Sequence, residues 1–155
     1  MTVPRYLEDL TVGERHTAGP IELTEAESVA FATRYDPQPM HMDAAFAVQG
    51  PFHGLIASGW QTCSLMMRMT IQAKPFGSTL VLGLGVDELR WPTPVRPGDS
   101  IAAEIEILSI TPSKSKPQFG VVRMRSTGRN QRGEVVLSMI TAVWVPRTPA
   151  WGVTH

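Results

Sequence analysis

The sequence predicts an α+β domain in which an antiparallel sheet of about five strands wraps around one long central helix. Residues 59–72 are rich in Leu, Met and Gln and contain a single charged residue, Arg68, as expected for a helix packed into a core. Beyond residue 79 the apolar residues fall at alternate positions, which is the period of strands with one buried face. One apolar helix followed by several short strands is typical of a sheet that packs against a single helix.

The first strand and the first helix are predicted over residues 14–34. Residues 14–23 form the strand. Thr24 follows in the position of a helix N-cap, and Glu27 stands three residues later, where its side chain completes a capping box. The helix that Thr24 opens ends before Pro37, since proline disfavours helical backbone at the residue that precedes it.

A short helix, a turn and the long helix follow. Asp43 is the predicted cap of a helical piece over residues 43–49, and Gly and Pro residues predict a turn at residues 50–54. Ser58 is the predicted cap of the long helix, which starts at Gly59. Because the long helix carries a single charge, we expect it to be buried on almost every side.

Four strands are predicted in the second half of the chain. Leu80, Leu82 and Leu84 occupy alternate positions in the first of them, and Glu104 and Glu106 alternate with isoleucines in the second. Turn residues such as Pro, Gly, Ser and Asn separate the strands, as they do in antiparallel sheets. The predicted strands cover residues 79–91, residues 101–110, a segment around residues 122–125 and residues 135–145.

The composition indicates one domain that does not act on polyanions. The chain has 155 residues, of which 43% are hydrophobic, so it is long enough for one core. We expect a single domain over residues 1–155, with a flexible tail at residues 147–155. The 14 basic and 14 acidic residues balance, which argues against binding to nucleic acid or to an anionic membrane. The expected partners are a small molecule and further copies of the chain.

The sequence also predicts a cytoplasmic location. The N-terminus lacks the apolar segment of a signal peptide, and no run approaches the ~20 apolar residues of a membrane span. Cys63 is the only cysteine, so no internal disulfide can form. Its apolar neighbours favour a buried thiol in a reducing compartment over a nucleophile.

The candidate catalytic residues lie in the run Asp36-Pro37-Gln38-Pro39-Met40-His41. A carboxylate and an imidazole are well suited to proton transfer near neutral pH, and two prolines restrict the backbone between them. Two other interpretations are open. Asp36 could end the first helix while His41 is a hydrogen-bonded core residue, or His41, Asp43 and His53 could bind a metal. The metal interpretation lacks a third ligand at typical spacing, so no metal is expected.

Gly59 is the candidate donor to a negatively charged oxygen. It stands where the long helix begins, and backbone N–H groups at a helix N-terminus can face an oxyanion. Glycine also allows a ligand to approach the backbone closely. Proton transfer beside such a donor is the chemistry that a reaction next to a carbonyl group requires.

These residues resemble the MaoC-like dehydratases and (R)-specific enoyl-CoA hydratases, and the resemblance covers almost the whole chain. The hydratase pattern Asp-x-Asn-Pro-x-His-x-Asp appears as residues 36–43, with Gln38 where the family usually has Asn. Ser58 stands where many hydratases have His. Weaker matches lie at residues 56–59, 89–99 and 113–117.

The resemblance implies the hot-dog fold and the reversible syn addition of water to a 2-enoyl-CoA thioester, which gives (R)-3-hydroxyacyl-CoA. It implies that Asp36 and His41 activate the water while the amide of Gly59 holds the thioester oxygen. Coenzyme A is then part of the substrate, and no separate cofactor is expected. A homodimer or larger homo-oligomer is also implied, because related hot-dog proteins pair their sheets edge to edge. Two alternatives are a hot-dog acyl-CoA thioesterase and a non-catalytic domain that binds acyl-CoA.

The residues expected to bind substrate are less distinctive. Candidates for the lining of an acyl pocket are Phe46, Phe52, Trp60 and Met67. Ordinary core packing explains these four equally well. Ser58, next to the predicted oxyanion donor, is a further candidate. Lys114 and Lys116 can meet the phosphates of coenzyme A as point charges, or they can simply keep a hairpin rich in Ser and Pro solvated.

Overall fold

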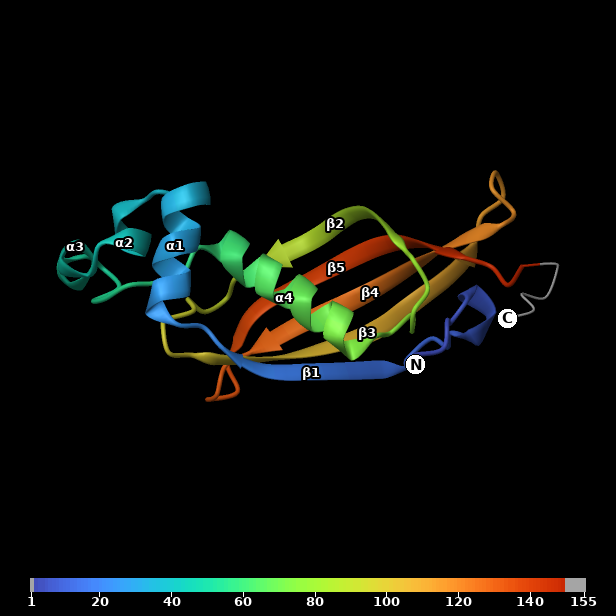
Figure 1. Cartoon of the computed structure of the whole chain (residues 1–155), viewed down its shortest axis with the longest axis horizontal. Coiled ribbons are helices and arrows are strands. Elements are labelled where there is room, and N and C mark those ends of the chain that lie inside the picture. The colour runs from blue at the N-terminus through green and yellow to red at the C-terminus, as the bar shows by residue number, and fades with distance from the viewer. Residues whose placement is uncertain (1, 150–155) are drawn as a thin grey trace.

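The computed structural model describes residues 2–149 and contains one five-stranded antiparallel sheet beside a long helix (Figure 1). The strands are β1 (Arg15–Glu22), β2 (Leu82–Arg90), β3 (Ser100–Pro112), β4 (Phe119–Arg129) and β5 (Val135–Pro146), in the spatial order β1-β3-β4-β5-β2. The helices are η1 (Leu7–Asp9), α1 (Glu25–Tyr35), α2 (Pro39–Met42), α3 (Ala44–Gln49) and α4 (Gly59–Ala73). Figure 1 shows α4 lying across the sheet, with α1, α2 and α3 beyond one end. The predicted fold class is confirmed.

The predicted helix starts are confirmed by their caps. Thr24 Oγ1 accepts a hydrogen bond from the Glu27 N–H, and the Glu27 carboxylate accepts one from the Thr24 N–H. Asp43 caps α3 and Ser58 caps α4 in a similar way, each accepting a backbone N–H with its side chain. A cap of this kind contributes about 1 kcal/mol to helix stability.

Two short helical elements lie outside the sequence predictions. Pro39 begins α2, where its missing N–H costs no hydrogen bond and its fixed φ suits the first helical position. The four residues of α2 and the three of η1 are too few for hydrophobic periodicity to reveal a helix.

The core lies between α4 and the inner face of the sheet. Ile105 and Ile107 of β3 are completely buried, as their alternation with glutamates predicted, and Ile101 is completely buried as well. Met66 and Met69 of α4 belong to the same buried cluster. Burying an apolar side chain of this size stabilises a fold by roughly 1.5–3 kcal/mol.

The prediction that α4 is buried on almost every side is wrong for this chain. Trp60, Met67 and Ile71 expose 59%, 54% and 65% of their surface. Their positions recur at helical spacing, so they form one exposed apolar stripe along α4. The reason is architectural: the sheet of one chain covers one side of the helix only.

Strand β2 is an exposed sheet edge. It pairs with β5 on one side, and Leu82, Leu84 and Val86 are exposed along it. A strand of this kind presents unpaired backbone groups and apolar side chains to any chain that can extend the sheet.

Within residues 2–149, no helix combines the length and the apolar character needed to cross a membrane.

The chain that follows β5 is attached to the N-terminal region. Glu8 of η1 accepts hydrogen bonds from the Arg147 Nε, at 2.6 Å, and from the Thr148 N–H, at 3.0 Å. Burial acts to raise the pKa of Glu8, but these hydrogen bonds outweigh it and lower the pKa to about 2. The first residues of the predicted flexible tail are therefore anchored, and the remainder, residues 150–155, lies outside the described residues.

The Glu8 anchor gives a pH-dependent prediction. We expect Glu8→Gln to lower the free energy of unfolding at pH 7 by about 0.5–1 kcal/mol, a modest value because the pair is partly exposed and screened. The difference should shrink as the pH falls from 4.5 toward 2, since the unfolded carboxylate takes up its proton first. Urea unfolding at several pH values measures this, with the exposed Glu22→Gln as control. An equal difference at pH 7 and pH 3 would contradict it.

Candidate active site

The structure brings Asp36 and His41 together. Asp36 is the C-cap of α1, and its φ of −150° and ψ of 69° turn the chain out of the helix ahead of Pro37. His41 lies in α2, whose first residue is Pro39. The His41 Nε2 lies 3.4 Å from the Asp36 Oδ2. The predicted acid and base therefore face each other.

A hydrogen bond to the backbone fixes the orientation of the His41 ring. His41 is 4% exposed, and its Nδ1 lies 2.7 Å from the carbonyl oxygen of Ile56. A carbonyl oxygen can only accept a hydrogen bond, so Nδ1 carries a proton. In the neutral ring Nε2 is then an unprotonated acceptor that faces the Asp36 carboxylate. A water that lies beside both atoms could donate one hydrogen to each.

The Asp36 carboxylate is held by two side-chain donors. Gln38 Nε2 donates to Oδ1 and Ser58 Oγ donates to Oδ2, each at 2.7 Å. These two bonds, first that of Gln38 and then that of Ser58, lower the pKa of Asp36 despite its partial burial, and His41 adds to the effect. The residue is ionised at neutral pH, as a proton acceptor must be.

Sequence reasoning assigned Ser58 to the cap of α4 and to substrate binding, but it missed the bond to Asp36. The bond of Gln38 was missed as well. The signal for Gln38 was its position, because an amide two residues after an acid can bend back onto the acid in a tight turn. No local signal links Ser58 to Asp36.

Gly59 has the free donor at the start of α4. The Trp60 N–H is bonded to the Ser58 side chain, and the Gln61 N–H to the Ser58 carbonyl. Among the described residues the Gly59 N–H has no hydrogen-bond partner. It is therefore available to an oxyanion at a helix N-terminus.

Trp91 explains why position 59 is glycine. A Cβ at that position would lie 2.7 Å from Trp91 Cε2, closer than two carbon atoms can pack. The Trp91 Nε1 also donates to the Gly59 carbonyl at 3.0 Å. Sequence reasoning gave Trp91 no role, because it lies in the loop that follows β2 and meets Gly59 only in the folded chain.

One pocket joins these residues. It has a volume of about 550 Å³, and Asp36, His41 and Gly59 all contribute to its lining. Phe52 and Trp60, two of the candidates for an acyl pocket, line it as well. The loop of residues 91–95 forms the wall next to Gly59, where the Trp60 and Trp91 rings meet edge to face at 5.5 Å.

Other predicted substrate residues do not reach this pocket in the single chain. Lys114 and Lys116 lie in the hairpin between β3 and β4, at the opposite end of the sheet from α1, α2 and α3 (Figure 1). The Lys116 Nζ stands 4.3 Å above the Trp144 ring, a cation–π contact. Phe46 is exposed on α3, and Met67 lines a different groove.

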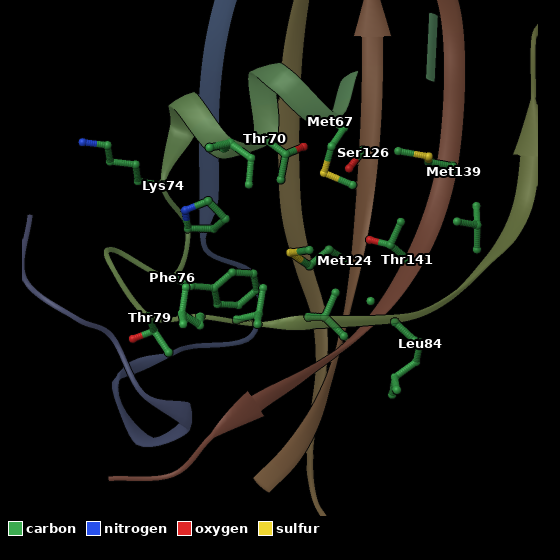
Figure 2. A pocket seen from close by; sticks show the side chains of 18 of the residues that line it. Met67, Thr70, Lys74, Phe76, Thr79, Leu84, Met124, Ser126, Met139 and Thr141 are labelled. Carbon is green, nitrogen blue, oxygen red and sulfur yellow. The ribbon is translucent and has the colours of Figure 1, made fainter. Parts of the chain in front are cut away.

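That second groove is apolar and has a volume of about 660 Å³. Figure 2 shows Met67, Met124 and Met139 extending into the same space from α4, β4 and β5, with Leu84 of β2 at its side. The catalytic candidates are absent from its lining, so it is not the place of the proton chemistry.

Two further titratable residues lie outside the lining of this pocket. His53 is exposed in the turn before α4, as a loop histidine. Cys63 is half-buried, and burial raises the pKa of its thiol, which disfavours a nucleophilic thiolate. His41, Asp43 and His53 do not form a metal site; within residues 2–149 no three His, Cys, Asp or Glu residues gather as metal ligands.

The sequence and the fold match one group of known proteins. Residues 10–130 match the model of the MaoC like domain, and the chain belongs to this family. The solved MaoC-like dehydratase from Rhodospirillum rubrum is 42% identical, with a TM-score of 0.84 over 93% of this chain and 98% of that one.

Two curated relatives add to this comparison. The uncharacterised protein YdeM of Bacillus subtilis is 26% identical over 91% of this chain and 99% of its own length. The (R)-specific enoyl-CoA hydratase of Aeromonas caviae is 33% identical over 57% of this chain and 65% of its own length. The predicted family and the predicted hot-dog fold are confirmed.

Proposed function

We propose that this protein catalyses the reversible syn addition of water to a 2-enoyl-CoA, giving (R)-3-hydroxyacyl-CoA. One observation carries the proposal: Asp36 and His41 face each other in the same pocket as the free N–H of Gly59. Hydration of an enoyl thioester needs a proton acceptor for water, a proton donor for C2 and a donor to the enolate oxygen. The names of the relatives, hydratases and dehydratases, support the same class of reaction.

In the proposed reaction, the Asp36 and His41 pair carries out both proton steps. The His41 Nε2 and the Asp36 Oδ2 hold the water, and the pair takes one of its protons as the hydroxyl oxygen bonds to C3. The electron pair of the double bond moves onto the thioester oxygen, which the Gly59 N–H stabilises. The pair then returns the proton to C2 on the same face, and the thioester carbonyl re-forms. Dehydration is the reverse.

The test is incubation with a panel of 2-enoyl-CoA thioesters of different length and branching. Hydration is expected to remove the absorbance of the conjugated enoyl group without releasing a thiol, and the product should be the (R)-hydroxy thioester. Release of coenzyme A would indicate a thioesterase instead. Tight binding with neither signal would indicate a non-catalytic acyl-CoA-binding domain.

We also propose that the chain acts as a homodimer built on the β2 edge. The unpaired strand, the exposed stripe of α4 and the apolar groove between them form one continuous surface, and a second copy that continues the sheet from β2 would cover it. When a two-fold axis continues the sheet at this edge, the strands of the partner run antiparallel to those of this chain. The partner subunit's Lys114 and Lys116 would thus come to the end where this chain has its pocket, where they could meet the phosphates of coenzyme A.

Leu84→Asp tests this dimer. A carboxylate in the centre of the apolar edge would be buried without a partner, so we expect a shift from dimer to monomer and a large loss of turnover. Light scattering at micromolar concentration gives the mass of each variant. Val12→Asp is the control, because Val12 is also exposed, at 57% against 45% for Leu84, but lies just before β1, the strand at the opposite edge of the sheet from β2. A monomeric wild-type protein with full activity would overturn the proposal.

A further inference from the structure

The turn of residues 50–54 contributes to one wall of the active-site pocket. Phe52, which lines the pocket, is followed by His53 in a left-handed conformation, with a φ of 55°. A residue other than glycine seldom adopts this conformation unless its surroundings hold it there. The Gly54 N–H at the end of the turn donates to the Ala47 carbonyl of α3 at 3.0 Å.

Two hydrogen bonds tie this turn and the segment after it to the opposite wall, the loop of residues 91–99. Arg96 Nη2 donates to the Phe52 carbonyl at 2.6 Å, and the Ala57 N–H donates to the Val95 carbonyl at 2.7 Å. The loop offers a firm support, because the buried Asp99 accepts the Arg96 N–H at 2.9 Å.

Residues between and directly after these two bonds contact the catalytic pair. The Ile56 carbonyl fixes the proton on His41 Nδ1, and Ser58, one residue after Ala57, donates to Asp36. Arg96 therefore anchors the start of a segment on which the placement of both catalytic candidates depends.

We infer that Arg96 is a positioning residue: it holds the turn of residues 50–54 against the loop of residues 91–99, so that Phe52 closes the pocket over the acyl group of the thioester. This inference rests on the proposed function. Phe52 would contact the substrate in its ground state and in the transition state alike. Loss of its placement should thus raise KM more than it lowers kcat.

The test uses Arg96→Ala, Phe52→Ala and the double variant. Loss of either side chain is expected to raise KM for a 2-enoyl-CoA about tenfold, the effect of losing one ordinary apolar or hydrogen-bonding contact, with a smaller fall in kcat. The double variant should have the KM of Phe52→Ala alone, because Arg96 acts through Phe52. Arg96→Lys, which keeps one donor, should recover part of the loss. Fully additive effects would overturn the inference.

The matched control is Arg15→Ala. Arg15 is an exposed arginine that contacts Glu104 and Glu106 beside β1, far from the pocket, and its removal should leave KM unchanged. A short N-acetylcysteamine thioester, which lacks phosphates, separates positioning from charge. If Arg96→Ala raised KM for the coenzyme A substrate but not for this analogue, Arg96 would be a phosphate ligand and the inference would be wrong.

Hydrogen exchange makes the inference testable even if the protein has no hydratase activity. Without substrate, Arg96→Ala is expected to speed the exchange of the Gly54 and Ala57 amides, while Arg15→Ala should not. The milder Arg96→Lys variant serves for this measurement if Arg96→Ala unfolds. Unchanged exchange at both amides in a folded Arg96 variant would overturn the inference, whatever the catalytic result.

Discussion

Asp36→Asn is expected to lower turnover of a 2-enoyl-CoA by about 100-fold to 10,000-fold, the range associated with general acid and base groups. The amide oxygen can still accept the hydrogen bond of Gln38, and the amide NH2 can donate to Ser58 Oγ, so the position of residue 36 should change little. It cannot take a proton from water. Steady-state kinetics on wild type and variant measure the effect, and a KM that stays near the wild-type value would show that the pocket is intact.

The matching change at His41 is best made as His41→Asn. Its amide nitrogen can replace Nδ1 as the donor to the buried Ile56 carbonyl, while Nε2 is lost. Turnover should fall as far as in Asp36→Asn, and the double variant should lose little more, because residues that act on one water act as a unit. Near-normal turnover in either single variant would overturn the catalytic assignment.

His41→Ala is expected to behave differently from His41→Asn in stability. It leaves the Ile56 carbonyl without its donor in a buried site, which costs about 1–3 kcal/mol of unfolding free energy. The sequence left two interpretations of His41, catalytic base or hydrogen-bonded core residue. The structure shows why they are not exclusive: one ring nitrogen is buried against the backbone, and the other faces Asp36.

Much of the fold follows from local sequence patterns. The capping box of Thr24 and Glu27, the caps Asp43 and Ser58, and the isoleucine alternation of β3 all act within a few residues. These patterns predicted the order of the main elements. They could not reveal that α4 has an exposed stripe, because the sequence of a helix shows which of its faces are apolar but not how many of them its own sheet covers.

The active site was predictable to the extent that it is local. Asp36 and His41 are five residues apart in a segment stiffened by two prolines, so their proximity could be expected. The contacts that tune them come from far along the chain. Ser58 reaches Asp36 across 22 residues, and Arg96 reaches Phe52 across 44. The first contact exists only once the start of α4 lies beside the end of α1, and the second only once the loop after β2 lies beside the turn of residues 50–54.

The second large effect on turnover is expected when the N–H of Gly59 is removed. Gly59→Pro is the substitution that removes it. Proline is well accepted at the first position of a helix, and Ser58 already has the extended backbone that proline requires of its predecessor, with φ −57° and ψ 135°. Any side chain at position 59 collides with Trp91, however, so the substitution must be made in a Trp91→Ala background. Gly59→Ala in the same background is the matched control, since it adds a Cβ but keeps the donor.

Comparison of these two double variants isolates one hydrogen-bond donor. Gly59→Pro is expected to turn over a 2-enoyl-CoA about 100-fold more slowly than Gly59→Ala, the usual cost of losing a donor to a developing oxyanion. The reduction should lie mainly in kcat, because the negative charge on the thioester oxygen develops only as the hydroxyl group adds to C3. Circular dichroism and thermal unfolding establish that α4 is intact in both. Equal kcat values in the two variants would show that the oxyanion is held elsewhere, and the helix N-terminus would then have no part in the reaction.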